Sequence, residues 1–107
     1  MIIRKASIED INILIELRID FFTENRGNLT KEENIAIRTQ LSGYFEKHIQ
    51  DQTLIAALAE TDNQILATAF LVITEKPAGP AFLTGKIGTL LNVLTYPDIG
   101  EKASLQK

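Results

Sequence analysis

Two polar side chains stand in apolar surroundings, where they could contact a bound molecule. Asn92 interrupts the apolar run at residues 89–95, and a polar side chain there needs a hydrogen-bond partner if it is buried. Arg18 lies on the apolar side of a predicted helix, where its guanidinium could hold a carboxylate or its aliphatic stem could cover the edge of the core. For Asn92 a ligand contact and a structural hydrogen bond both stay open, whereas for Arg18 we favour the packing role.

The remaining reactive side chains and the charge of the chain exclude several kinds of site. The chain has no Cys and one His, so a thiolate or His-rich metal cluster cannot form. His48 falls near the predicted end of a helix, where a cation suits the helix dipole, and we interpret it as a surface capping residue. The formal net charge is -3 and the 11 Lys and Arg residues are scattered, which argues against binding nucleic acid through its phosphates.

Capping patterns and apolar periodicity predict two helices in the first half of the chain. Ser7, followed three residues later by an acidic residue, is typical of a helix start. Apolar residues then recur at spacings of three and four, which predicts a helix over about residues 8–24 whose acidic side chains form a solvated face. Thr30, with a glutamate three residues later, forms a capping box that begins a second helix ending near Gln50.

Short apolar runs predict strands before and after these helices. The runs cover residues 2–6, 53–60, 65–74 and 89–95. Asp62 and its neighbours form a turn signal between two of the runs, which indicates a hairpin, and Pro77 and Pro80 mark residues 75–84 as an exposed loop. The predicted order is therefore β-α-α-β-β-β, within a single domain over residues 1–107.

The last predicted strand carries the most specific pattern of the chain. Residues 85–97 read G-K-I-G-T-L-L-N-V-L-T-Y-P, which resembles the fourth strand of GNAT-superfamily N-acetyltransferases, where N-V-x-T-x-P stands just before the cofactor loop. Residues 17–22, L-R-I-D-F-F, are similar to an L-R-x-x-F-hydrophobic segment in the first helix of part of that superfamily. The resemblance extends to Pro97 and implies a partial GNAT-like α/β (α+β) fold, with a mainly antiparallel sheet and two N-terminal helices.

The resemblance implies transfer of an acetyl group from acetyl-CoA to a primary amine, on a small molecule or a peptide, by direct attack. Proximity and polarisation of the carbonyl would supply most of the rate. By position, the main-chain groups of Val93, Leu94 and Thr95 would hold the pantetheine arm and polarise the acetyl carbonyl. Asn92 would face the acceptor amine, and Arg18 is the second candidate for contact with the substrate.

The same run also fits an ordinary strand whose side chains alternate between the two faces of a sheet, and main-chain binding is compatible with that alternation. One face would then carry Leu91, Val93 and Thr95, and the other Leu90, Asn92 and Leu94. The resemblance places the general acid beyond residue 107, so we expect no complete catalytic set within the chain. Tyr44 and Tyr96 are poor substitutes by position.

The residues after Pro97 do not continue the family pattern. A GNAT enzyme continues with R/Q-x-x-G-x-G/A, whose backbone N–H groups at a helix N-terminus hold the pyrophosphate. Residues 98–107, D-I-G-E-K-A-S-L-Q-K, contain one Gly and no Arg. With permitted codons, the same nucleotides read two positions later encode Y-R-R-K-G-I-A-T, which is the expected motif. We therefore predict a frameshift near Asp98 and a truncated, inactive chain that binds acetyl-CoA weakly or not at all.

A second hypothesis is a non-catalytic α/β interaction module. Loss of the second half of the fold would leave an open strand edge at residues 89–95 and uncovered apolar side chains, which predicts a homodimer through the C-terminal strand or its sheet face. No apolar stretch approaches the ~20 residues that cross a bilayer, and the N-terminus lacks the order of a secretory signal. We expect a cytoplasmic protein without membrane partners.

Overall fold

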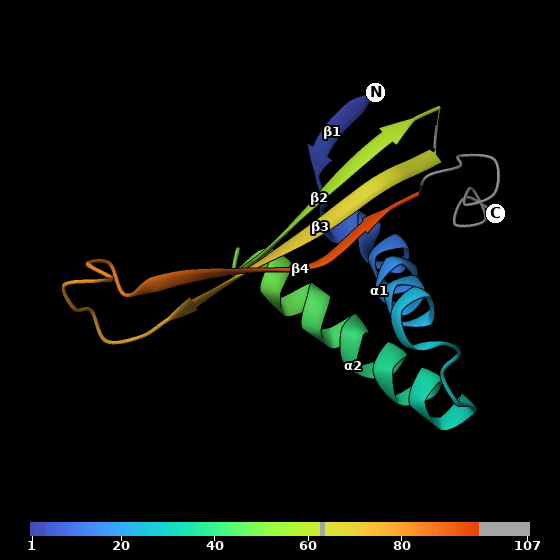
Figure 1. Cartoon of the computed structure of the whole chain (residues 1–107), viewed down its shortest axis with the longest axis horizontal. Helices are drawn as coiled ribbons and strands as arrows, with labels where there is room; N and C mark the ends of the chain where they lie inside the picture. The colour runs from blue at the N-terminus through green and yellow to red at the C-terminus, as the bar shows by residue number, and fades with distance from the viewer. Residues whose placement is uncertain (63, 97–107) are drawn as a thin grey trace.

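The computed structural model describes residues 1–62 and 64–96 (Figure 1). The elements are β1 (Ile2–Lys5), a short 3-10 helix (Ile8–Asp10), α1 (Ile11–Arg26), α2 (Lys31–Gln50), β2 (Leu54–Thr61), β3 (Gln64–Glu75) and β4 (Lys86–Thr95). This confirms the predicted β-α-α-β-β-β order. The hypotheses on the phosphate loop and the frameshift fall on residues 98–107, outside the described residues.

Thr30 caps α2, whereas Ser7 caps the short 3-10 helix and α1 itself begins three residues later than the predicted helix, at Ile11. The Thr30 amide donates to Glu33 Oε1 at 2.9 Å, and the Glu33 amide donates to Thr30 Oγ1 at 3.1 Å. The Ser7 amide donates to Asp10 Oδ2 at 2.8 Å. Asp10 also accepts two hydrogen bonds from the Arg4 guanidinium, both 2.9 Å long, which hold the pKa of its carboxyl below the usual range. These bonds tie the end of β1 to the start of the helical segment.

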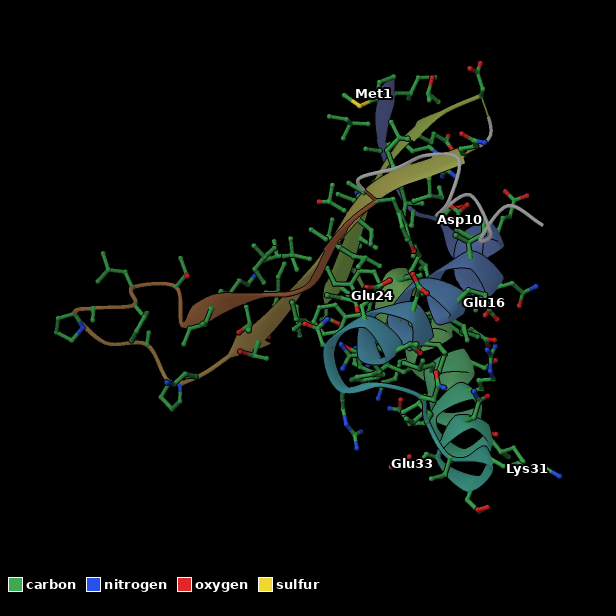
Figure 2. The ribbon with its side chains drawn as sticks, turned by 45° about the vertical axis from the view of Figure 1, so that its right-hand side comes forward. Met1, Asp10, Glu16, Glu24, Lys31 and Glu33 are labelled. Atoms are coloured by element: carbon green, nitrogen blue, oxygen red, sulfur yellow. The ribbon has the colours of Figure 1, made fainter. Side chains whose placement is uncertain are left out.

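The acidic side chains of the first helical segment do not all form the solvated face that we predicted. Glu16, labelled in Figure 2, fits the prediction because it is exposed and pairs with Arg38 of α2. Asp10 is buried against Arg4, and the Asp20 carboxylate accepts a hydrogen bond from the Tyr96 hydroxyl. The prediction is wrong for Asp10, which binds Arg4 of β1, and for Asp20, which binds Tyr96 directly after β4.

The four strands form one antiparallel sheet in the order β1-β2-β3-β4, with α1 and α2 on one of its faces (Figure 1). The hairpin predicted between β2 and β3 is confirmed, and Asp62 in its turn has a positive φ of 49°. The core lies between the helices and the sheet. Its largest fully buried apolar side chains are Leu14, Leu17, Phe45, Leu58 and Phe70.

The hairpin of β3 and β4 continues beyond the helices as a long two-stranded arm (Figure 1). Pairing runs on to Glu75 and Lys86, so β4 begins three residues before the predicted run. The exposed loop at the tip of the arm is confirmed. Within the described residues, neither helix is long and apolar enough to cross a membrane.

Candidate functional site

A β-bulge divides β4 at Asn92. Phe70 of β3 pairs with Leu91 and Thr68 pairs with Leu94, so Asn92 and Val93 together stand opposite one residue, Ala69. Asn92 has a φ of 53°, in the left-handed region that Asn adopts more readily than most residues. The bulge interrupts the ladder between β3 and β4 at this point and changes the direction of the strand.

Because of the bulge, the side chains of β4 do not alternate simply. Leu90 and Val93 are exposed, whereas Asn92 and Leu94 are buried and Leu91 packs against the core. Leu90 therefore does not share a face with Asn92 and Leu94, although simple alternation predicted that it would. The extra residue in the bulge shifts the pattern by one position.

Both polar atoms of the Asn92 side-chain amide form hydrogen bonds with α1. Its Oδ1 accepts from Arg18 Nη1 at 3.3 Å, and its Nδ2 approaches the carbonyl oxygen of Leu17 at 3.5 Å. The residue is 1% exposed. Of the two interpretations that the sequence left open, the structural hydrogen bond is therefore present, and it fixes the bulge to the first helix. The contact with the acceptor amine stays a prediction.

Arg18 is a half-buried cation without an acidic partner among the described residues. Its guanidinium carbon lies 4.4 Å from the centroid of the Phe22 ring, and its one hydrogen bond goes to the neutral amide of Asn92. Burial lowers the pKa of Arg18, but a guanidinium stays protonated at neutral pH. Arg18 also lines a cavity, and its packing role stays a prediction.

That cavity of about 260 Å³ lies between the two helices and strands β2, β3 and β4. It is lined by Arg18, Gln40, Leu41, Tyr44, Phe45, Leu54, Phe70, Val72 and Leu91. The lining is mostly apolar, and its polar groups come from the helices. Leu91 directly precedes Asn92, so the cavity adjoins the bulge.

Tyr44 lines this cavity, although sequence reasoning set it aside by position as a poor substitute for the general acid. Its hydroxyl makes no hydrogen bond within residues 1–62 and 64–96. Burial raises the pKa of Tyr44, and the nearby Arg18 charge opposes that rise, so the hydroxyl is neutral and able to donate at neutral pH. The only signal available in the sequence was the place of Tyr44 on the apolar face of the second helix.

Tyr96 and His48 are engaged elsewhere. The buried Tyr96 hydroxyl donates to Asp20 at 2.7 Å, and burial together with this bond raises the pKa of Tyr96 well above its ordinary value. His48 Nδ1 lies 2.6 Å from Thr53 Oγ1 beyond the end of α2, which places it at the predicted helix end. Neither residue lines the cavity. In the described part of the chain, no group of His, Asp and Glu could hold a metal.

Val93 completes the bulge, and Leu94 and Thr95 follow it on a strand with one neighbour. Within the described residues, β4 pairs with β3 and with no strand on its other side. The Leu94 side chain belongs to the core, whereas Val93 and Thr95 are exposed. The three residues thus present main-chain groups along an open edge next to the cavity, although their binding roles remain predictions.

Comparison with solved structures shows that the chain is a partial GNAT-like fold. A predicted acetyltransferase from Clostridium acetobutylicum, solved with acetyl-CoA, is 31% identical over 90% of this chain, with a TM-score of 0.78. A GCN5-related N-acetyltransferase from Ralstonia eutropha JMP134 is 21% identical over 98% of the chain, with a TM-score of 0.75. The chain spans 60% of the first protein and 68% of the second.

A third structure, a ribosomal-protein-alanine N-acetyltransferase from Brucella melitensis biovar Abortus 2308, supports the same fold. It is 14% identical, with a TM-score of 0.55, over 98% of this chain and 66% of its own. No protein-family model and no curated protein sequence matches the chain. The fold predicted from the sequence is therefore confirmed by structural similarity alone.

Proposed function

We propose that this chain is the part of an acetyl-CoA-dependent N-acetyltransferase that binds the acetyl-pantetheine end of the cofactor and the acceptor amine. One observation carries the proposal: the bulge at Asn92 interrupts β4 between an open strand edge and a partly apolar cavity. The edge offers main-chain groups to the cofactor, and the cavity offers room for an acceptor beside it. The similarity to a Clostridium acetobutylicum acetyltransferase solved with acetyl-CoA supports this assignment.

The open edge of β4 suits a pantetheine arm. That arm contains two amides, which can hydrogen-bond to a strand edge as an added strand would. On this proposal the main-chain groups of Val93, Leu94 and Thr95 bind the arm. The exposed Val93 and Thr95 side chains lie beside it, while the buried Leu94 side chain anchors the strand in the core.

The chemical step needs a nucleophile and a polarised carbonyl. The neutral amine attacks the thioester carbon, and the carbonyl oxygen gains negative charge, which main-chain N–H donors on β4 stabilise. The tetrahedral intermediate then collapses, the carbon–sulfur bond breaks, and the thiolate leaves. The proton lost by the amine balances the one taken up by the thiolate. Holding the two reactants together supplies much of the remaining rate enhancement.

Asn92 acts here as a positioning residue. Its hydrogen bonds with Arg18 and the Leu17 carbonyl fix the bulge to α1, so the edge of β4 and the cavity keep one geometry. Displacement of a reacting group by about 1 Å can cost two orders of magnitude in rate. A change at Asn92 should therefore affect acetyl transfer without removing a reacting group.

We further propose that the 107-residue chain is inactive by itself. The single Gly and missing Arg of residues 98–107 support this, since pyrophosphate binding uses a glycine-rich loop of free N–H groups. The nucleotide sequence after the Pro97 codon is the first test. A shifted frame that encodes Arg, Gly and a further helix would support the enzyme proposal and provide a longer protein to assay.

The assay measures acetyl transfer from acetyl-CoA to primary amines by that longer protein and by the 107-residue chain. The longer protein should be active, and its Asn92→Ala variant should lose roughly ten- to a hundredfold in kcat, whereas Thr89→Ala on the exposed part of β4 should not. Acetyl transfer by the pure 107-residue chain would contradict its inactivity. A longer protein that acetylates no amine would contradict the proposed reaction.

The non-catalytic interaction module remains the second proposal, and one observation favours it. Leu90 is 63% exposed and Val93 is 55% exposed, both on the open-edged strand β4. Exposed apolar residues on a strand edge favour pairing with another chain. A homodimer through the sheet face opposite the helices is compatible with acetyl transfer, whereas pairing through the edge of β4 would occupy the main-chain groups proposed for the pantetheine arm. The interaction module replaces the first proposal if the cofactor does not contact β4.

A further inference from the structure

Arg18 is the cation among the residues that line the cavity, and most of its N–H donors have no protein partner among the described residues. A guanidinium has five N–H donors, and Arg18 uses one of them, toward the neutral Asn92 amide, among the described residues. The acidic side chains nearby are engaged elsewhere: Glu16 pairs with Arg38, and Asp20 accepts from Tyr96. Arg18 is therefore a half-buried cation whose remaining donors are available to an anion.

The position of the guanidinium is fixed on two sides. The Phe22 ring covers one face at 4.4 Å, and Asn92 accepts a hydrogen bond from Nη1. A second hollow of about 270 Å³ between α1 and α2 shares Arg18, Gln40 and Leu41 with the main cavity. A planar guanidinium held in this way is suited to a carboxylate, which it can bind with two parallel hydrogen bonds.

The rest of the cavity defines the other end of the ligand. Leu41, Phe45, Phe70 and Leu91 give it apolar walls, and the Tyr44 hydroxyl adds a neutral donor without a hydrogen-bond partner in the described residues. Its volume of about 260 Å³ is below the usual range of roughly 300–1,000 Å³ for drug-sized ligands. The cavity therefore suits a molecule of amino-acid size with an apolar body.

We infer that the acceptor is a compact primary amine that also carries a carboxylate and an apolar or aromatic body, and that Arg18 binds the carboxylate. The inference rests on the proposed function, because it names the substrate class of that site. Arg18 bonds directly to the bulge residue Asn92, so a carboxylate on Arg18 places the rest of the molecule beside β4. The amine of the same molecule then lies within a short reach of the strand edge.

The test uses the 107-residue chain and a matched pair of probes, 3-phenylpropionate and 3-phenylpropionamide, which differ in the carboxylate alone. Titration is followed by NMR of the ¹⁵N-labelled chain, including the Nε–H signal of Arg18. The acid should bind about tenfold tighter than the amide, as expected for a hydrogen bond to a charged group, and should shift the Arg18 signal. L-Phenylalanine should bind at the same place.

Arg18→Met keeps most of the aliphatic stem and removes the charge, so it should abolish the preference for the acid. Arg26→Met is the matched control, since Arg26 lies on the same helix, is exposed and makes, among the described residues, only a 3.8 Å ion pair with Glu33. If Arg18→Met does not fold, the comparison of acid with amide on the unchanged chain still decides the matter. Equal affinity for the two probes, no binding of either, or an acid preference that persists in Arg18→Met would overturn the inference.

The two proposals fail in different ways. Titration of the same sample with S-acetylpantetheine reports on β4, whereas the carboxylate probe reports on Arg18. A carboxylate preference without any response of β4 would count against acetyl transfer and leave the anion site standing. A response of β4 without a carboxylate preference would count against the substrate class alone.

Discussion

At the scale of single residues, Asn92 combines a strained backbone with buried hydrogen bonds. Its φ is 53°, and its side chain bonds to Arg18 and Leu17. Asn92→Ala should lower the free energy of unfolding by about 2–3 kcal/mol, from the cost of a left-handed alanine and the loss of the hydrogen bonds. Thr89→Ala, on the exposed part of the same strand, should change it by less than about 0.5 kcal/mol. Urea denaturation measures both, and equal effects would contradict the role given to the bulge.

Because of Tyr96, the stability of the chain should decline at alkaline pH. Burial, the hydrogen bond to Asp20 and the charges of Asp20 and Glu24 raise its pKa in the folded state, whereas the unfolded chain ionises near the ordinary value of 10. Above that pH the unfolded state loses a proton that the folded state keeps. The stabilisation is thus complete below pH 10 and declines as pH rises, by about 1.4 kcal/mol per pH unit.

Tyr96→Phe removes this ionisation and should flatten the decline in the free energy of unfolding above pH 10. Denaturation of both proteins at several pH values between about 8 and 11 provides the measurement. An identical pH slope in the two proteins would show that the Tyr96 hydroxyl is not held by Asp20 as described.

The sequence identified Asn92 and Arg18 as separate candidates but could not pair them. They are 74 positions apart, and their contact depends on the rotation of α1 and on the bulge. Tyr44 was judged by position alone, because the cavity that it lines exists only after α2 packs on the sheet. Polar residues in apolar runs can be recognised in a sequence, whereas the partners that satisfy them depend on tertiary packing.

At the scale of elements, the starts of the two helical segments were predictable because capping is local, although the first segment opens with a 3-10 turn before α1. The Thr30 and Glu33 pattern and the Ser7 and Asp10 pattern each act over three residues, and both form the expected backbone contacts. The bulge in β4 was not predictable in this way. Its register depends on pairing with β3, more than 20 positions earlier, and an Asn in an apolar run fits a regular strand equally well.

Gly43 is a weak point within α2 that can be tested directly. It lies in the helix interior, and a β-carbon added there would meet no atom within 4 Å. Gly43→Ala should therefore raise the free energy of unfolding by about 0.5–1 kcal/mol, because alanine loses less conformational freedom in a helix. Thermal or urea denaturation measures the gain. A loss of stability would mean that a methyl group at this position meets a neighbouring group, contrary to the exposed position of Gly43.

At the scale of the whole molecule, the distribution of apolar surface predicts self-association. Both helices cover one face of the sheet (Figure 1). The other face carries Ala57, Ala67 and Ala69 beside the exposed Val93. The outer edge of β4 has no partner strand among the described residues. We predict a two-fold symmetric homodimer through β4 or this face. Light scattering that shows a monodisperse monomer, with residues 89–95 protected from hydrogen exchange, would contradict it.

The most direct test of the proposed function is an NMR titration of the ¹⁵N-labelled chain with S-acetylpantetheine and, separately, with acetyl-CoA. S-Acetylpantetheine has the reacting end of the cofactor without the pyrophosphate, so its binding does not require a phosphate loop. We predict saturable shifts at Val93, Leu94 and Thr95 with a Kd of roughly 1 mM or weaker, and acetyl-CoA no more than about threefold tighter. Micromolar binding of acetyl-CoA would contradict the proposal that residues 98–107 lack a pyrophosphate-binding loop. Shifts that leave all three β4 amides unchanged would contradict the account of the chain as the acetyl-binding part of an acetyltransferase.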